Sequence, residues 1–276
     1  MTTLPSSPPV SFSPPPIAIF VATVWEFAAV RAAFPGGWKD AVRGRSRYRV
    51  PLNGGECWVI QTGVGPQKAR EAARAVFSEH AVALAISSGF ACALIPAAIG
   101  DILIGTRAAS IDRGETTDAL DYVEVAGVER EHWHTAFSIH VPDVRTISGD
   151  FISLDRIVYR AADKVALAQR TRATGLDMES AALAREAKAA RVPFFIVRSV
   201  SDLLMEELPL DFNLFLRPTG WLKGLCALLA HPSSLLGINR LRRQSAVAGA
   251  TLTRCLQAVC KTRFGVRSDS PMTMAL

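Results

Sequence analysis

The sequence predicts an α/β fold: a single domain whose mixed, largely parallel central sheet is flanked by helices, with a C-terminal helical extension. Short apolar runs alternate along the chain with stretches of helical spacing, an alternation typical of parallel sheets covered by helices. Glycines and prolines separate the two kinds of stretch. With 276 residues, 49% of them hydrophobic, the chain is long enough to bury one large core.

In the first third of the chain, each predicted strand leads into a helix. The apolar run Ile17 to Thr23 predicts a strand, and the helical spacing that follows it stops at Pro35. The run Cys57 to Gln61 predicts a second strand, and Pro66 suits the first turn of the alanine-rich helix after it.

The same alternation continues in the rest of the chain. Val82 to Ile86 predicts a third buried strand, and Asp101 to Ile104 begins a fourth. The polar interval from Arg107 to Val141 shows no clear pattern and receives no assignment. Further on, Leu176 to Ala190 has the composition of a helix, and Phe194 to Val197 that of a buried strand.

We expect four segments along the chain. These are a disordered Pro/Ser-rich leader at 1–16, the α/β domain at 17–215, a C-terminal helical extension at 216–262 and a flexible tail at 263–276. The apolar stretch Ile17 to Phe34 is interrupted by Glu26 and Arg31, so the sequence offers no run of roughly 18 apolar residues that could span a bilayer.

Cysteine content and charge narrow the classes of function. Five cysteines at scattered spacings suit a reducing compartment, so a cytoplasmic location is expected, and no metal site is indicated. The net charge of +6 arises largely from a basic stretch, Arg240 to Arg267, that contains no acidic residue. This stretch lacks a nucleic-acid-binding module, and no nucleic-acid partner is expected.

Polar residues follow three of the predicted strands. Glu26 comes after the first strand, Ser88 and Gly89 after the third, and Ser201 with Asp202 after the strand that begins at Phe194. Ligands of parallel α/β sheets bind beyond the carboxyl ends of strands, so these residues predict a site with two carboxylates for acid/base chemistry. The alternative is that Asp202 only caps the next helix and that Glu26 is a solvated residue in the first turn of its helix.

A set of motifs in a fixed order resembles the family of nucleoside phosphorylases and methylthioadenosine/adenosylhomocysteine nucleosidases. The resemblance covers about residues 17 to 215 and implies a nucleoside phosphorylase-like fold. Its motifs are Ala22-Thr23-Val24-Trp25-Glu26, Ser88-Gly89-Phe90-Ala91, Ser148-Gly149-Asp150-Phe151, the Met178-Glu179 pair that opens an alanine-rich helix, and Arg198-Ser199-Val200-Ser201-Asp202.

The resemblance assigns roles in breaking the N-glycosidic bond of a purine nucleoside. Asp202 would be the acid that protonates the leaving purine, Glu179 the carboxylate beside the ribose, and Glu26 the group that activates water. The same match implies that Ser201 helps hold Asp202. By position, Met178 would pack against the face of the sugar. Arg198 would orient Glu179 or contact an anion.

The base pocket implied by the family consists of backbone groups from Phe90 through Ala91 to Cys92 and of the segment Phe151-Ile152, with Phe151 available for stacking. Residues 88 to 93 depart from the family's Gly-Ser-Ala-Gly-Gly pattern, because bulkier residues replace small ones. Asp177 stands where small nucleosidases commonly have a glutamate, so the ribose contacts also differ.

The resemblance favours hydrolysis without a cofactor, with phosphate as a co-substrate in the alternative, phosphorolytic reaction. The glycines Gly63 and Gly65 ahead of a helix are suited either to an anion or to a tight turn. A non-catalytic nucleoside-binding protein is a further alternative, although the joint presence of Glu26 and Asp202 argues for an enzyme.

The C-terminal part resembles the hopanoid-associated phosphorylase-like proteins, which implies adenosylhopane as the lipid-linked substrate. The resemblance rests on Arg217-Pro218-Thr219-Gly220, on the leucines of Trp221 to Leu229 and Leu235 to Leu241, and on the signature Asp177-Met178-Glu179-Ser180. Leucines with arginines nearby could rest on the inner face of an anionic membrane, or the segment could pack on its own sheet. The family also implies a homodimer.

Overall fold

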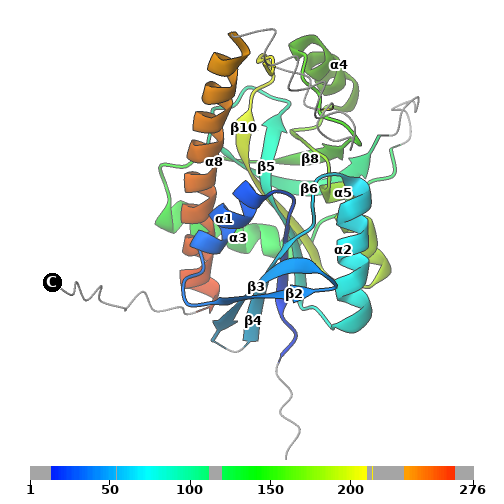
Figure 1. Cartoon of the computed structure of the whole chain (residues 1–276), viewed down its shortest axis with the longest axis vertical. Coiled ribbons are helices and arrows are strands. Elements are labelled where there is room, and N and C mark those ends of the chain that lie inside the picture. The colour runs from blue at the N-terminus through cyan, green and yellow to red at the C-terminus, as the bar shows by residue number, and fades with distance from the viewer. Residues whose placement is uncertain (1–13, 54, 112–119, 210–212, 214–232, 265–276) are drawn as a thin grey trace, which may run out of the picture.

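The computed structural model of the protein describes residues 14–53, 55–111, 120–209, 213 and 233–264 (Figure 1). Its strands are β1 (Ile17–Val21), β2 (Trp38–Val42), β3 (Arg45–Leu52), β4 (Gly55–Gln61), β5 (Leu84–Ala93), β6 (Ile102–Ser110), β7 (Val123–Glu124), β8 (Thr146–Ser153), β9 (Gly175–Asp177) and β10 (Phe194–Asp202). Its helices are α1 (Val24–Ala32), α2 (Pro66–Glu79), α3 (Gly127–His140), α4 (Ala161–Thr171), α5 (Ser180–Ala189) and α8 (Ser233–Phe264).

Strands β5 and β10 form the centre of the sheet. They pair in parallel, and from β10 the pairing passes through β6, β8 and β9 back to β5, so that these strands close on themselves. On its other side β5 pairs with β1, and β4, β3 and β2 extend the sheet. Because β4, β1, β5 and β10 are parallel, their carboxyl ends meet at one edge, the top of Figure 1. The mixed sheet flanked by helices is thereby confirmed.

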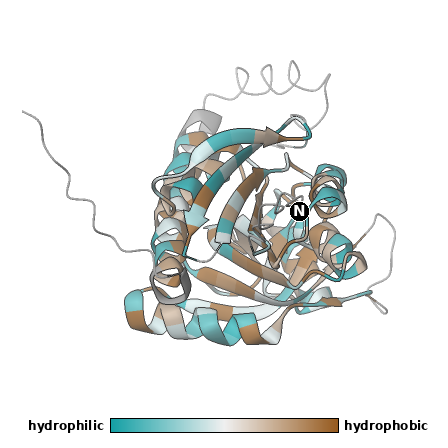
Figure 2. Ribbon diagram, turned by 90° about the horizontal axis from the view of Figure 1, so that it is seen from below, coloured by the Kyte–Doolittle hydropathy of each residue, from teal (hydrophilic) through white to brown (hydrophobic). Residues whose placement is uncertain are grey.

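Helices cover the sheet on two sides (Figure 1). One side holds α8, which packs on β10, α1 and α3, and the other holds α2 against α5. The sheet between them is largely hydrophobic, whereas hydrophilic residues lie mostly on the outer faces (Figure 2). This separation is what a domain with one buried core requires.

The two helices that follow β1 and β4 begin in different ways, α1 with a side-chain cap and α2 with a glycine-proline pair and no side-chain cap. At α1, the Thr23 hydroxyl accepts a hydrogen bond from Glu26 N, and the Glu26 carboxylate accepts one from Thr23 N, which together form a capping box. At α2, Gly65 adopts φ 103° immediately before Pro66 in the first turn. A face of small buried residues on α2, among them Ala69 and Ala73, allows close contact with α5.

The third strand is longer than the sequence suggested. We expected it to end at Ser87, Ser88 and Gly89, but β5 continues to Ala93 because its second half pairs with β10 and β9. Ser88 and Gly89 therefore lie within a strand. The unassigned interval Arg107 to Val141 completes β6 and then, beyond residues 112–119, forms β7 and α3.

The polar hairpin of β2 and β3, strand β8 and helix α4 were not anticipated. The helix expected from Leu176 to Ala190 was placed too early, because Gly175–Asp177 form β9, which pairs with β5 and β8, and α5 begins only at Ser180. At the C-terminus α8 begins at Ser233, while the leucine stretch Trp221 to Leu229, most of the leader (1–13) and the tail (265–276) lie outside the described residues. The segment boundaries proposed from the sequence stay predictions. No helix among the described residues is both long and apolar enough to cross a membrane.

Candidate active site

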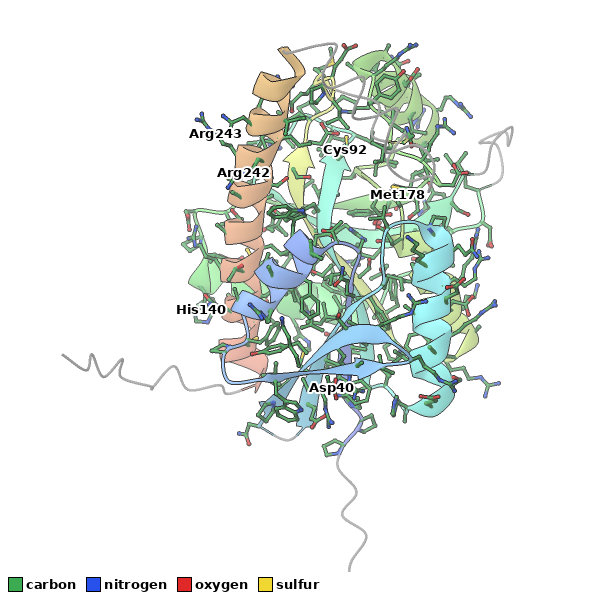
Figure 3. All side chains as sticks on the ribbon, in the orientation of Figure 1. Asp40, Cys92, His140, Met178, Arg242 and Arg243 are labelled. Atoms are coloured by element: carbon green, nitrogen blue, oxygen red, sulfur yellow. The ribbon has the colours of Figure 1, made fainter. Side chains whose placement is uncertain are left out.

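A cavity of about 330 Å³ opens at the carboxyl ends of the parallel strands. The turn after β1, the second half of β5, the end of β10 and the start of α5 all contribute to its walls. Cys92 and Met178 mark its position toward one end of the molecule (Figure 3). The wall combines carboxylates with apolar side chains, which suits a ligand that is itself part polar and part apolar.

Glu26 lies in this wall with both oxygens engaged. Its Oε2 accepts hydrogen bonds from Ala22 N at 3.1 Å, Thr23 N at 2.7 Å and Thr23 Oγ1 at 2.9 Å. Its Oε1 accepts from Phe90 N at 2.7 Å. A Cβ on Gly89, whose φ is +138°, would collide with Oε1, so the glycine allows the backbone of β5 to approach the carboxylate.

Arg198 on β10 is a buried guanidinium surrounded by three carboxylates. Its Nε lies 2.7 Å from Asp177 Oδ2, its Nη2 3.6 Å from Glu179 Oε2 and its Nη1 3.7 Å from Glu26 Oε1. It also donates to Phe90 O at 3.0 Å. Only 1% of Arg198 is exposed, so it lies behind the cavity wall and acts on a ligand through the carboxylates that it holds.

Glu179 has the most perturbed carboxyl group of this cluster. Burial, reinforced by the neighbouring Asp177 and Glu26, raises its pKa to about 7 despite the charge of Arg198. One guanidinium cannot neutralise three carboxylates, and the shortage of positive charge favours a proton on Glu179. Its Oε1 accepts from Gly65 N at 2.8 Å, so the N-terminus of α2 also stabilises this group.

Asp177 organises the start of α5. Its Oδ1 accepts from the backbone N–H groups of Glu179 and Ser180, each at 3.2 Å, and from the Ser153 hydroxyl. Its Oδ2 accepts from the Ser180 hydroxyl and contacts Arg198. The shorter aspartate therefore serves mainly to position the neighbouring Met178-Glu179 pair.

Asp202 lies at the end of β10 and forms an ion pair with Lys164 of α4. Lys164 Nζ is 2.9 Å from Oδ1 and 2.8 Å from Oδ2. Burial raises the pKa of Asp202 above its usual value, and the lysine opposes this rise. The Cys92 thiol is close by, and burial raises its pKa, so it stays a neutral thiol.

The structure brings together most of the residues that the sequence singled out. Those on the cavity wall are Glu26, Phe90, Ala91, Asp177, Met178, Glu179, Ser201 and Asp202. Those placed elsewhere are Ser88, Gly89, Phe151, Ile152 and Arg198. Ser88 is fully buried, and its hydroxyl has no hydrogen-bond partner in the part of the chain that is described.

The implied stacking role of Phe151 does not fit its position. Phe151 and Ile152 are both fully buried in the core, and the Phe151 ring lies against Gly175 of the neighbouring strand. The chain instead places Ile157 and Val158, which follow β8, on the cavity wall.

Sequence reasoning missed the other apolar wall residues and Lys164. Val64, Leu208 and Leu241 reach the cavity from three separate segments, of which the last is α8. The residues described contain no group of histidine, cysteine or acidic side chains that could hold a metal ion.

Comparisons with known proteins show which family this chain resembles in sequence. A family model described as "Phosphorylase superfamily" matches residues 16–217. A 5'-methylthioadenosine/S-adenosylhomocysteine nucleosidase from Anoxybacillus flavithermus is 25% identical over 211 residues, which cover 73% of this chain and 91% of the relative. One from Shewanella loihica is 25% identical over 82% of this chain and 98% of its own.

Solved structures show the same fold at lower identity. The nucleosidase from Neisseria meningitidis, crystallised with methylthio-immucillin-A, is 19% identical with a TM-score of 0.70, and the match covers 89% of this chain and 98% of that one. Futalosine hydrolase from Helicobacter pylori is 15% identical with a TM-score of 0.69, covering 90% and 97%. The nucleoside phosphorylase-like fold expected from the sequence is confirmed.

Proposed function

The chain belongs to the phosphorylase superfamily, and on that premise we propose that it hydrolyses the N-glycosidic bond of an adenine nucleoside and releases adenine. Membership makes it an enzyme of the N-glycosyl hydrolase or nucleoside phosphorylase class. The observation that carries the finer proposal is the placement of Glu26, Glu179 and Asp202 on the wall of one cavity.

The three carboxyl groups have distinct tasks in this reaction. As the bond between C1′ and the purine breaks, the ribose becomes positively charged and the base becomes negatively charged. Asp202 donates a proton to a ring nitrogen of the base, and Glu179 stabilises the charge on the ribose. A water molecule adds to C1′ and gives its proton to Glu26. The products are adenine and the free sugar, and exchange with solvent restores both carboxyl groups.

Two contacts support water rather than phosphate as the nucleophile. The N–H of Gly65, at the helix N-terminus where a phosphate could bind, already donates to Glu179 Oε1 at 2.8 Å. The Arg198 guanidinium is surrounded by Asp177, Glu179 and Glu26. Both groups are thus engaged with carboxylates, which would repel a phosphate. We therefore propose water as the nucleophile and a reaction without a cofactor.

We propose adenosylhopane, a lipid-linked nucleoside, as the substrate. Support comes from the apolar side chains Val64, Ile157, Val158, Leu208 and Leu241, which line the cavity together with the carboxylates. An apolar wall of this kind suits a 5′ substituent that is itself apolar. The resemblance of the C-terminal part to hopanoid-associated proteins points to the same class of substrate.

Contact with a membrane follows from the same proposal. Arg242 and Arg243 extend from α8 into solvent (Figure 3), and Trp25 and Met205 are 68% and 76% exposed near the cavity. Basic and large apolar side chains together bind anionic lipid surfaces. We propose a cytoplasmic homodimer that binds peripherally to the inner face of the membrane. Light scattering and sedimentation with anionic vesicles would test these two points.

The deciding experiment measures adenine release from adenosine, methylthioadenosine and adenosylhopane, with and without phosphate. We expect release without phosphate, fastest from adenosylhopane, and a loss of 10²-fold or more in Asp202→Asn. Asp143→Asn, an exposed aspartate on the surface, is the matched control and should behave as wild type. Strict dependence on phosphate would make the protein a phosphorylase, and no release from any purine nucleoside would leave a nucleoside-binding protein.

A further inference from the structure

Lys164 is a buried lysine that the mechanism above does not use. It lies on α4 with none of its surface exposed. Besides both oxygens of Asp202, its Nζ contacts the backbone carbonyls of Leu203 at 3.2 Å and Glu206 at 2.6 Å. Burying an ammonium group is costly unless its N–H groups all find acceptors, and here they do.

The same lysine ties Asp202 to the segment that follows β10. This segment, 203–208, lines the cavity through Leu208, whose N–H donates to Tyr159 O at 2.9 Å. Its Glu206 carboxylate accepts from α8, with Arg240 Nε at 2.8 Å and Gln244 Nε2 at 2.9 Å. Helix α4, the 203–208 segment and α8 are therefore connected around Asp202.

We propose that Lys164 is a positioning residue for Asp202, which it holds at the cavity wall and whose carboxylate it stabilises once the proton has passed to the purine. The inference rests on the proposed nucleosidase reaction. In that step the O–H bond of Asp202 breaks, the new N–H bond forms on the purine, and a negative charge appears on Asp202 in a largely buried place. An ammonium group within 2.8–2.9 Å of both oxygens offsets this charge as it forms.

The charged and titratable groups around Asp202 come from three elements. Burial raises the pKa of Asp202, Lys164 of α4 lowers it, and Glu206 in the following segment raises it. The Cys92 thiol of β5 lies close by and donates to Ala93 O. Because Arg240 pairs with Glu206, Lys164 is the strongest electrostatic partner of the acid among these groups. Without Lys164, Asp202 would keep its proton to higher pH and would be a weaker acid.

The test compares pH profiles of kcat/KM for the best nucleoside substrate in wild type and Lys164→Met, which keeps the apolar stem and removes the charge. We expect kcat to fall about 10- to 100-fold and the alkaline limb, where Asp202 loses its proton, to move up by roughly one to three pH units. Lys39→Met, an exposed lysine on β2, is the control and should match wild type.

Lys164→Arg separates charge from geometry. It should keep the alkaline limb near that of wild type and lower kcat, because the guanidinium retains the charge but directs its N–H groups differently. If Lys164→Met does not fold, the test is made with Lys164→Arg. A kcat of Lys164→Arg equal to that of wild type would then overturn the proposal. An active wild type whose pH profile is unaffected in Lys164→Met would refute the role of Lys164 alone, whereas an inactive wild type would refute the nucleosidase reaction itself.

Discussion

Replacing Glu179 with Gln should make the protein more stable at alkaline pH while it removes activity. Burial raises the pKa of Glu179 from 4.5 to about 7, so between these two pH values the folded protein binds a proton that the unfolded chain releases. Stability from this group is therefore full below about pH 4.5 and is lost as pH rises to 7. At about 1.36 kcal/mol per pKa unit, the loss amounts to about 3 kcal/mol.

Glu179→Gln should abolish this part of the pH dependence. The amide keeps the shape of the protonated acid, and its oxygen can still accept from Gly65 N. We expect the variant to lie within about 1 kcal/mol of wild type at pH 5 and to exceed it by up to about 3 kcal/mol at pH 8. Activity should fall by 10²-fold or more, because an amide cannot stabilise a positively charged ribose as a carboxylate does.

Urea denaturation at several pH values between 5 and 8 measures this effect, with Glu131→Gln on the exposed face of α3 as the matched control. The control should follow the wild-type curve at every pH. Two results would refute the reasoning that burial disfavours the ionised form of Glu179. One is a Glu179→Gln variant less stable than wild type at pH 8, and the other is a variant whose free energy of unfolding varies with pH as it does in wild type.

Three further substitutions test the cluster around Glu26. Gly89→Ala should lower the free energy of unfolding by about 2 kcal/mol or more, because its Cβ would clash with Glu26 Oε1 and its φ is positive. A urea midpoint equal to that of wild type would contradict the close approach of the two residues. Arg198→Met should lower the free energy of unfolding by about 3–5 kcal/mol at pH 8 and by less at pH 5, where Glu179, whose pKa is raised to about 7, carries its own proton; denaturation with no difference between the two pH values would count against this. Thr23→Ala should lower the free energy of unfolding by about 1 kcal/mol because the α1 cap is lost. An unchanged thermal midpoint would show that the capping box contributes nothing to stability.

Much of the fold could be predicted because its strands and helices are specified by patterns within short stretches of the sequence. Apolar runs followed by helical spacing identify β1 with α1 and β4 with α2, and the Met178-Glu179 pair identifies the start of α5. The carboxylates could be predicted because the rule that ligands bind beyond strand ends applies to Glu26 and Asp202 directly.

Gly89 shows where local interpretation went wrong. A glycine after two serines is typical of a strand end, yet β5 continues through it because its second half pairs with β10 and β9. The glycine is needed for the close approach of the Glu26 carboxylate, a contact with a residue 63 positions earlier in the chain. Lys164 was missed for a similar reason, since its partner Asp202 lies 38 residues away. The available signal was its place on the inner face of α4, three residues before the buried Leu167.

The two ends of the cavity differ in charge, and the difference suits the proposed reaction. Around Arg198 three carboxylates share one guanidinium, so this end is negative whenever more than one of them is ionised. At the other end Asp202 and Lys164 form a pair that is neutral overall when Asp202 is ionised and positive when it carries a proton. A bond that breaks into a cationic sugar and an anionic purine gains from this asymmetry only if the sugar lies at the Glu179 end and the base at the Asp202 end. For the proposed reaction, the charges therefore favour a nucleoside bound with its sugar at the Glu179 end and its base at the Asp202 end.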